Sequence, residues 1–280
     1  MLCTDLDRTL IPNGAQPEHP DARACFREFC RRPEVTLVYV TGRHQALVRE
    51  AIADYDLPTP AYLVADVGTR IYDLDHEPWT ELTAWEAEIA RDWRGTTHEE
   101  LARALAPCAE LQLQEQSKQA PFKLSYYLDL NCDRERVLGW VTQILRGLGV
   151  TASLVWSVDE PARIGLLDVL PARATKLHGI EFLRRHLHYA RREVVFAGDS
   201  GNDLPVLAGP IPSVLVANAD AEVKAQAQTL ARRQGRRQTL YQAVDGPFPL
   251  GGNYAAGVLQ GVWHFVPALR PFLQAIAPPS

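Results

Sequence analysis

The chain opens with Leu2-Cys3-Thr4-Asp5-Leu6-Asp7-Arg8-Thr9, a short apolar run that ends in a pair of carboxylates. Such a run predicts a buried strand followed by a loop. On an extended segment the side chains of Asp5 and Asp7 point the same way, so one could attack phosphorus while the other transfers a proton. An isolated Asp-x-Asp is more often a turn or a solvated pair, so this motif needs supporting neighbours.

The same pattern of short apolar runs recurs along the chain and alternates with segments of helical period. Strands are predicted at Leu2 to Thr4, Val35 to Val40, Tyr62 to Val64, Glu193 to Ala197 and Ser213 to Val216. Helices are predicted at Pro20 to Cys30, Gln45 to Tyr55, Lys176 to His188, Asp220 to Leu230 and Tyr254 to His264. This order indicates an α/β fold with a Rossmann-like, doubly wound parallel sheet.

The middle of the chain differs in pattern. Two helical segments are followed by an alternating strand at Lys123 to Asp129, a helix near Arg134 to Leu148 and a strand near Ala152 to Trp156. We therefore predict a smaller α/β domain at 79–160, inserted into a core formed by 1–78 and 161–280.

Three more motifs lie at strand ends or helix starts of the predicted core. Thr41-Gly42-Arg43 offers a hydroxyl and a glycine turn that could donate hydrogen bonds to phosphate. Lys176 begins a predicted helix, and Gly198-Asp199-Ser200-Gly201-Asn202-Asp203 follows a predicted strand. Taken singly, these are more simply a helix cap, a surface lysine and a capped turn.

Taken together, the four motifs predict a metal site. Carboxyl ends of parallel strands share one sheet edge, where Asp5, Asp7, Asp199 and Asp203 would converge. Crowded carboxylates cannot all stay ionised without a cation, and oxygen-only ligands select Mg²⁺. Lys176 would supply the remaining positive charge.

The order Asp-x-Asp-x-Thr, Thr-Gly-Arg, Lys and Gly-Asp-x-x-Asn-Asp resembles the four motifs of haloacid dehalogenase phosphatases. The segment inserted between the second and third motifs is similar to the cap of the Cof-like branch. The resemblance implies a magnesium-dependent phosphatase that forms a phospho-aspartate.

The resemblance also implies a role for each position. Asp5 would be the nucleophile, and Asp7 the acid for the leaving alcohol and then the base for water. Mg²⁺ would be held by Asp5, the backbone carbonyl of Asp7 and Asp199, with Asp203 bound directly or through water. The phosphate would be held by Thr41, Gly42, Lys176 and Asn202.

Two positions depart from the family pattern. Many relatives have glycine where this chain has Arg8, although the sucrose-phosphate phosphatase branch commonly lacks it. Many also have Lys-Gly where this chain has Lys176-Leu177, which could shift the helix start that aims the lysine. Neither departure removes a carboxylate.

Several segments are similar to sucrose-phosphate phosphatases, which implies sucrose 6-phosphate as substrate. They are Val67 to Tyr72, Leu113 to Asp129, Leu167 to Pro171 and Tyr254 to Phe265. Mannosylfructose phosphate and glucosylglycerol phosphate stay as alternatives, because related caps serve them with similar residues.

Sugar contacts are expected in the cap. Lys123, Ser125 and Tyr127 share one face of the predicted strand, and Gln114 and Gln119 add further donors and acceptors for hydroxyl groups. From spacing alone, a half-buried strand with a solvated polar face is the simpler interpretation.

Two rival functions use the same fold. One is a non-catalytic sugar-phosphate sensor or the partner of a glycosyl-phosphate synthase, although a binder has no use for a proton-transferring Asp7. The other is a phosphotransferase that shares the phospho-aspartate but releases no free phosphate.

The composition of the chain limits which binding partners and which cellular setting are expected. The net charge of −5 and the pI near 5.9 disfavour nucleic acid, and the cluster of Arg232, Arg233, Arg236 and Arg237 is explained by the end of a helix. Five cysteines without zinc-like spacing favour a reduced, cytoplasmic setting. We expect no signal peptide and no membrane span, and a chain that acts as a monomer unless it associates with a synthase.

Overall fold

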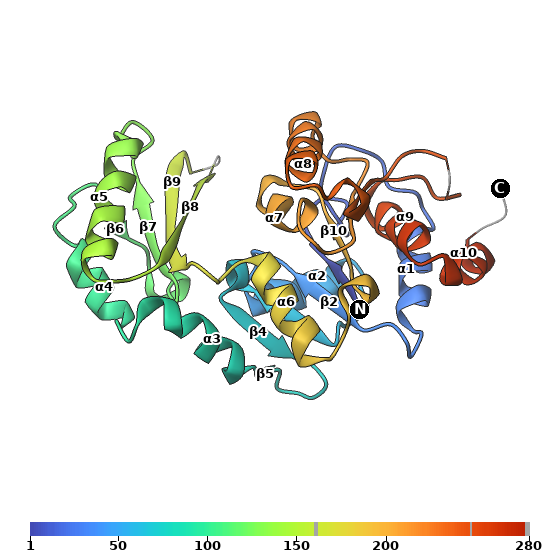
Figure 1. Cartoon of the computed structure of the whole chain (residues 1–280), viewed down its shortest axis with the longest axis horizontal. Coiled ribbons are helices and arrows are strands. Elements are labelled where there is room, and N and C mark those ends of the chain that lie inside the picture. The colour runs from blue at the N-terminus through green and yellow to red at the C-terminus, as the bar shows by residue number, and fades with distance from the viewer. Residues whose placement is uncertain (160–161, 247, 278–280) are drawn as a thin grey trace. The chain divides into compact units, whose positions relative to one another are not determined.

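The computed structural model describes residues 1–159, 162–246 and 248–277, and its contacts divide the chain into two compact units (Figure 1). Unit 1 comprises Met1–Glu81 and Lys176–Ser280, and unit 2 comprises Leu82–Thr175. Among the described residues, no helix is both long enough and apolar enough to cross a bilayer.

Unit 1 is built on an eight-stranded sheet with the order β12-β11-β10-β1-β2-β3-β4-β5. The neighbours of β1 are β10 and β2, both parallel to it, whereas β4 and β5 are antiparallel additions at one edge. The strands are β1 (Leu2–Thr4), β2 (Leu37–Val40), β3 (Tyr62–Ala65), β4 (Arg70–Asp73), β5 (Thr80–Glu81), β10 (Val195–Gly198), β11 (Ser213–Leu215) and β12 (Leu240–Gln242).

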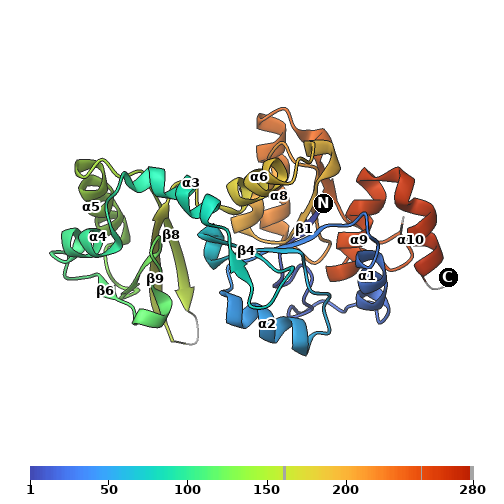
Figure 2. The same cartoon turned by 90° about the horizontal axis from the view of Figure 1, so that it is seen from below.

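Helices cover both faces of this sheet (Figure 2). Phe26 of α1, Val48 of α2 and Leu259 of α9 are fully buried in one apolar cluster on one side. On the other side α6 packs against β3, and α7 against β10 and β11. The helices are α1 (Ala22–Cys30), α2 (Gln45–Asp54), α6 (Lys176–His186), α7 (Leu204–Leu207), α8 (Ala221–Arg233), α9 (Tyr254–Phe265) and α10 (Arg270–Ile276). The predicted doubly wound α/β core is confirmed.

The hairpin of β3 and β4 was not predicted, although its turn contains Asp66 and Gly68, two residue types common in turns. The chain reverses through Asp66 and Val67, which have φ of 51° and 60°, and then Gly68 at 93°. Asp and Gly tolerate left-handed backbone, whereas this conformation is unusual for the β-branched Val67.

Unit 2 has a four-stranded antiparallel sheet with the order β6-β7-β9-β8. Its helices pack against one face, where Leu124, Tyr126 and Leu128 of β7 contact the apolar side of α5. The α4 helix begins at a capping box of Thr97 and Glu100. The elements are α3 (Thr83–Trp93), α4 (His98–Leu105), β6 (Gln112–Leu113), β7 (Leu124–Leu128), α5 (Arg134–Gly147), β8 (Ala152–Asp159) and β9 (Ile164–Pro171).

The second unit, Leu82–Thr175, begins and ends later than the segment 79–160 predicted from the sequence, since β5 at Thr80–Glu81 pairs with β4 of unit 1. The expected boundary between 160 and 161 lies outside the described residues, and β9, which was expected in the core, pairs with both β7 and β8. The two partners fix β9 in unit 2, which ends at Thr175. The next residue, Lys176, is the first residue of α6.

Candidate active site

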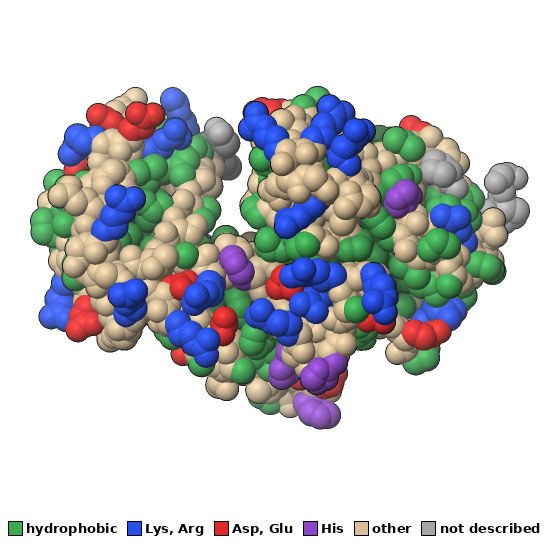
Figure 3. Space-filling model, in the orientation of Figure 1, with side chains coloured by type: hydrophobic (Ala, Val, Ile, Leu, Met, Phe, Trp, Pro, Cys, Tyr) green, Lys and Arg blue, Asp and Glu red, His purple; other side chains and the backbone are tan. Residues whose placement is uncertain are grey.

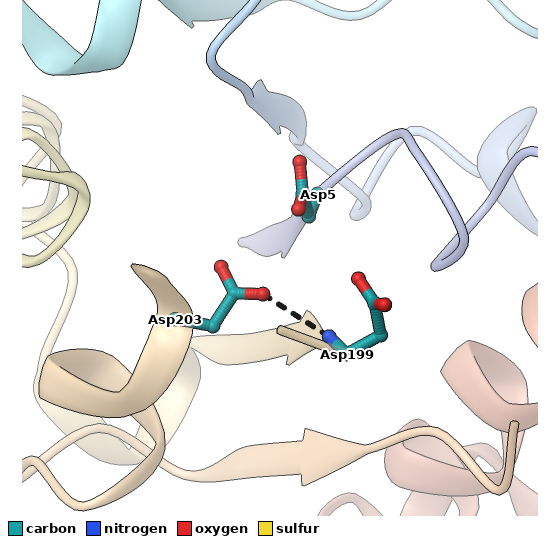
Figure 4. Close-up of side chains that lie close together, drawn as sticks. All are labelled: Asp5, Asp199 and Asp203. Carbon is teal, nitrogen blue, oxygen red and sulfur yellow. Dashed lines mark hydrogen bonds between the residues drawn. The ribbon is translucent and has the colours of Figure 1, made fainter. Parts of the chain in front are cut away.

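Three carboxylates gather where β1 and β10 end. Thr4 pairs with Ala197 in the parallel register, so Asp5 and Asp199 emerge side by side at the carboxyl ends of adjacent strands. Asp203 lies at the end of a short 3₁₀ turn (Gly201–Asp203) and points toward both of them (Figure 4). One ligand oxygen from each of the three lies within 4.8 Å of the other two.

Asp203 braces the loop after β10. Its Oδ2 accepts hydrogen bonds from the backbone N–H of Asp199 and of Ser200, each at 3.1 Å. A side chain at Gly198 would place its Cβ 2.6 Å from the Asp203 carboxylate, so the glycine is required for this close approach. These contacts hold Asp199 in place.

Lys176 is buried between two of these carboxylates. Its Nζ lies 2.8 Å from Asp5 Oδ2 and 2.7 Å from Asp203 Oδ1. Burial alone would lower the pKa of Lys176, but the two neighbouring carboxylates outweigh burial and raise the pKa above its ordinary value. The lysine therefore stays charged and fixes the orientation of Asp5.

The crowding of the carboxylates also raises the pKa of Asp199 and of Asp5. Burial, with the nearby Asp203 carboxylate, raises the pKa of Asp199 to about 6, although a hydrogen bond from Thr9 at 3.0 Å opposes the shift. Burial also raises the pKa of Asp5, with Lys176 opposing it. A cation at this position would relieve the charge that burial leaves uncompensated.

The donor set fits a hard divalent cation, with Asp5 and Asp199 as the nearest ligands. Asp203 Oδ1 accepts from Lys176, and its Oδ2 has three donors, the Asp199 and Ser200 N–H groups and the Ser200 hydroxyl, whereas each oxygen of Asp5 has a single donor. Asp203 is therefore better placed to orient the site than to bind the ion directly. Oxygen-only ligands of this kind suit Mg²⁺.

Asp7 lies apart from this cluster. Arg43 donates to its two oxygens, with Nε at 2.8 Å and a terminal nitrogen at 2.6 Å, and Asn13 donates at 2.7 Å. Partial burial would raise the pKa of Asp7, but the Arg43 guanidinium and the other donors outweigh it and hold the pKa below its ordinary value.

The carboxylates face a cavity of about 460 Å³. Thr41 and Gly42, directly after β2, line it together with Asn202 and Asp5, so three of the four residues predicted to hold phosphate share one space with Asp5; Lys176 is not among the lining residues. A Cβ at Gly42 would meet nothing within 4 Å, which leaves its backbone open to a ligand. The other lining residues are Asp7, Arg8, Arg43, Leu47, Asp199, Ser200, Gly201, Asp220 and Val223.

Arg8 had no assigned role from the sequence, yet its side chain lines this cavity. Its guanidinium lies 3.5 Å from Asp199 and 2.9 Å from Asp220, and its backbone is left-handed with φ of 56°. Asn218 donates to the Arg8 carbonyl at 2.5 Å and accepts from the N–H of Tyr254 at 2.8 Å. The only feature of the sequence that singled out Arg8 was that many relatives have glycine at this position.

In unit 2, the two predicted glutamines are engaged by the backbone. Gln114 Nε2 donates to the Tyr126 carbonyl at 2.9 Å. Gln119 Nε2 donates to the carbonyls of Gln114 and Ser125, and its Oε1 accepts from the Ser125 N–H at 2.9 Å. Both amides thus support the loop beside β7.

The other three residues predicted to contact the sugar differ in whether their side chains already have hydrogen-bond partners. Ser125 is buried and donates to Asp168 of β9 at 2.5 Å, and the Tyr127 hydroxyl donates to Glu115 at 2.8 Å. Lys123 is partly buried, and in the described part of the chain its ammonium has no hydrogen bond or ion pair. Asp168, which the sequence did not suggest, lies on the same face as Ser125.

Basic side chains lie among polar ones over α8 (Figure 3). Arg232 and Arg233 in its last turn are exposed, as expected for cations that complement a helix dipole.

Comparison with known proteins gives a family match over most of the chain. The model of the family described as sucrose-6F-phosphate phosphohydrolase matches residues 1–266. A putative HAD-like hydrolase of Nitrosococcus oceani is 46% identical over 274 residues, which cover 98% of this chain and 74% of that protein. Sucrose-phosphatase 1 of Nicotiana tabacum is 27% identical over 276 residues, covering 95% of this chain; the chain spans 59% of that relative's length.

A comparison with solved structures also finds a sucrose-phosphatase. The sucrose-phosphatase of Synechocystis sp. PCC6803, in complex with sucrose and phosphate, superposes with a TM-score of 0.70 at 26% identity. The match covers 94% of this chain and 96% of that one.

Proposed function

The chain belongs to the sucrose-6F-phosphate phosphohydrolase family, within the haloacid dehalogenase superfamily, and is a phosphoric monoester hydrolase; on that premise we propose that it hydrolyses sucrose 6-phosphate to sucrose and phosphate. A sugar phosphate is the substrate class that the relatives support. The observation that carries the chemistry is the Asp5 carboxylate, held by Lys176 at the mouth of a cavity that Thr41 and Gly42 also line.

Asp5 is proposed as the nucleophile. Its Oδ1 accepts the N–H of Leu6 at 2.8 Å and its Oδ2 accepts from Lys176, so the side chain is held in one orientation. An Asp5 oxygen attacks phosphorus and the bond from phosphorus to the sugar oxygen breaks, which leaves a phospho-aspartate. Lys176 compensates the charge that moves to the phosphoryl oxygens.

Asp7 is proposed to move the proton in both steps. Its protonated form would donate a proton to the departing sugar oxygen, and the ionised form that Arg43 favours would then take one from the water that attacks the phospho-aspartate and regenerates Asp5. Thr41, Gly42 and Asn202 would hold the phosphoryl oxygens through hydrogen bonds.

Magnesium is proposed to bind Asp5, the backbone carbonyl of Asp7 and Asp199, with Asp203 acting as their support. When bound, it would neutralise phosphoryl charge that the clustered aspartates otherwise repel.

Unit 2 is proposed to supply sugar specificity. Lys123 is the strongest candidate among the five residues predicted there, because its ammonium has no other bond within the described residues. Gln114, Gln119, Ser125 and Tyr127 would act mainly by shaping the surface, since each already has a partner in unit 2.

The deciding experiment is a phosphate-release screen over sugar and disaccharide phosphates with Mg²⁺, with and without EDTA. We expect sucrose 6-phosphate to be turned over best and EDTA to abolish turnover. Preference for mannosylfructose phosphate or glucosylglycerol phosphate would overturn the assignment of sucrose 6-phosphate as substrate, but the assignment as a phosphatase would stand. Transfer of phosphate to a second sugar without release would indicate a phosphotransferase, and binding without turnover a sensor.

A further inference from the structure

Arg8 and Asp220 form an ion pair in the wall of the cavity that Asp5 faces. A terminal guanidinium nitrogen of Arg8 donates to Asp220 Oδ1 at 2.9 Å, and both residues line the cavity. Because many relatives have glycine at the position of Arg8, this side chain occupies a place where those relatives have none. The chemistry proposed above gives neither side chain a role.

The backbone of Arg8 is held at both of its polar groups. Its N–H donates to Asn13 Oδ1 at 2.7 Å, and its carbonyl accepts from Asn218 at 2.5 Å. Its φ of 56° lies in the left-handed region, which a residue with a Cβ adopts mainly where its surroundings impose it. The guanidinium therefore extends into the cavity wall from a backbone that is fixed on both sides.

The pair keeps hydrogen-bonding groups that it does not use. Within the described residues, neither Asp220 Oδ2 nor the second terminal nitrogen of Arg8 has a hydrogen-bond partner. The side chains of Arg8 and Asp220 are 38% and 62% exposed, so a ligand can reach both. A guanidinium with a spare donor beside a carboxylate with a spare acceptor can bind two neighbouring hydroxyl groups at once.

The same wall also has an apolar part. Val223 follows Asp220 by three positions at the start of α8, so the two side chains lie on the same side of the helix, and both line the cavity. Leu47 of α2 is a second apolar lining residue. Sugar rings carry hydroxyl groups at their edges and C–H groups on their faces. A wall with a few placed polar groups beside apolar side chains therefore suits a sugar ring.

We propose that Arg8 and Asp220 bind the hydroxyl groups of the sugar ring that carries the phosphate; this rests on the proposed function. In sucrose 6-phosphate that ring is joined to phosphorus through one carbon and one oxygen, so it lies in the cavity that Asp5, Arg8 and Asp220 line together. Arg8 offsets the charge of Asp220, which would otherwise repel the phosphate. Unit 1 thus recognises the phosphorylated ring, in addition to the sugar specificity proposed for unit 2.

The test compares two ligands that carry this ring with two that lack it. The ring-bearing measurements are kcat/KM for sucrose 6-phosphate and the inhibition constant of fructose 6-phosphate against p-nitrophenyl phosphate. The ring-free measurements are kcat/KM for p-nitrophenyl phosphate and the inhibition constant of inorganic phosphate. We expect Asp220→Ala to weaken the ring-bearing ligands about 10- to 100-fold more than the ring-free ones, the range for a hydroxyl bonded to a charged acceptor.

Two further variants frame this result. Asp220→Asn keeps the shape and one oxygen acceptor but loses the charge, so it should show the same selective loss more weakly. It also supplies the test if Asp220→Ala fails to fold, although the Asp220 side chain makes no cap hydrogen bond to α8. Glu222→Ala is the matched control, because Glu222 is an exposed carboxylate at the start of the same helix that does not line the cavity. This control should show no selective loss.

An equal loss on ring-bearing and ring-free ligands, or no loss on either, would overturn the proposal. A loss on sucrose 6-phosphate with wild-type binding of fructose 6-phosphate would also overturn it, because the other ring would then be the one that is bound. If the phosphate-release screen selects a different glycosyl phosphate, that ester and its own phosphorylated half take their places. A wild-type protein that releases no phosphate from any ester would instead remove the proposed function, and this proposal with it.

Discussion

Lys176 in unit 1 and Lys123 in unit 2 were both expected to bind substrate, yet their surroundings differ. Lys176 is 5% exposed and bonded to two carboxylates, whereas the Lys123 ammonium has no partner among the described residues. The first is part of a charge cluster that exists before any ligand arrives. The second has only the strand beside it, and its role depends on a substrate.

The same contrast extends to the neighbours of each lysine. In unit 1, parallel strand ends force Asp5 and Asp199 together, and their shared charge is the reason for a cation. In unit 2, Gln114 and Gln119 bond to nearby backbone, which is the ordinary use of a buried amide. Buried carboxylates that are crowded together point to a chemical role, whereas side chains whose hydrogen bonds are all made to nearby backbone point to a structural one.

The largest expected effect comes from Asp5→Asn. The amide keeps the shape of the side chain but cannot attack phosphorus, so turnover should fall by at least about 10³-fold. The metal-free protein should melt no lower than wild type, because the change removes a charge from a crowded cluster. Turnover within tenfold of wild type would remove Asp5 as the nucleophile.

Lys176→Met sharpens the contrast through stability. Removing one member of a buried ion network leaves Asp5 and Asp203 uncompensated, which costs about 3–5 kcal/mol. Lys123→Ala should change the free energy of unfolding by less than about 0.5 kcal/mol. Denaturant unfolding of both variants without substrate measures the difference, and equal losses would contradict it.

Lys123→Ala should show its effect in specificity. A charged donor bonded to a sugar hydroxyl contributes on the order of 1.5–3 kcal/mol, so kcat/KM for sucrose 6-phosphate should fall about 10- to 100-fold. The value for p-nitrophenyl phosphate should hold, because that substrate has no sugar.

Lys118→Ala is the control for this loss, since Lys118 is an exposed lysine in the same connection. Gln119→Ala should lower kcat/KM for sucrose 6-phosphate and for p-nitrophenyl phosphate by the same factor, because it loosens the loop at β7. An equal loss on both substrates in Lys123→Ala would assign it the same structural role as Gln119.

The smallest effect is a pH dependence of the metal-free protein. The folded pKa of Asp199, about 6, lies above its ordinary 3.8, so its contribution to stability is present in full below 3.8 and is lost as pH rises through about 6. In EDTA, lowering the pH from about 7.5 to about 5.5 should raise the Tm of wild type by about 1–2 °C more than that of Asp199→Asn. Scanning calorimetry measures both, and a smaller rise in wild type would show that its folded pKa is not raised.

The sequence predicted unit 1 far better than unit 2, for a physical reason. Apolar runs specify parallel strands, and parallel strands place their ends at one edge, so Asp5 and Asp199 could be grouped from the sequence. The partners of Gln119 and Ser125 depend on loop paths and on β9, which the sequence analysis assigned to the core. The pairing of Arg43 with Asp7 also went unpredicted, because motif spacing does not encode side-chain geometry.

The junction at Thr175 and Lys176 limits how the chain can be rebuilt. Unit 2 ends one residue before the buried lysine that begins α6. Successive helical positions differ by about 100° around the axis, so inserting a single residue directly after Lys176 would turn its ammonium away from both carboxylates. An engineer who exchanges unit 2 for another specificity module must therefore keep Lys176 as the first residue of α6, whereas the entry near Leu82 is far along the chain from Lys176 and from the three aspartates.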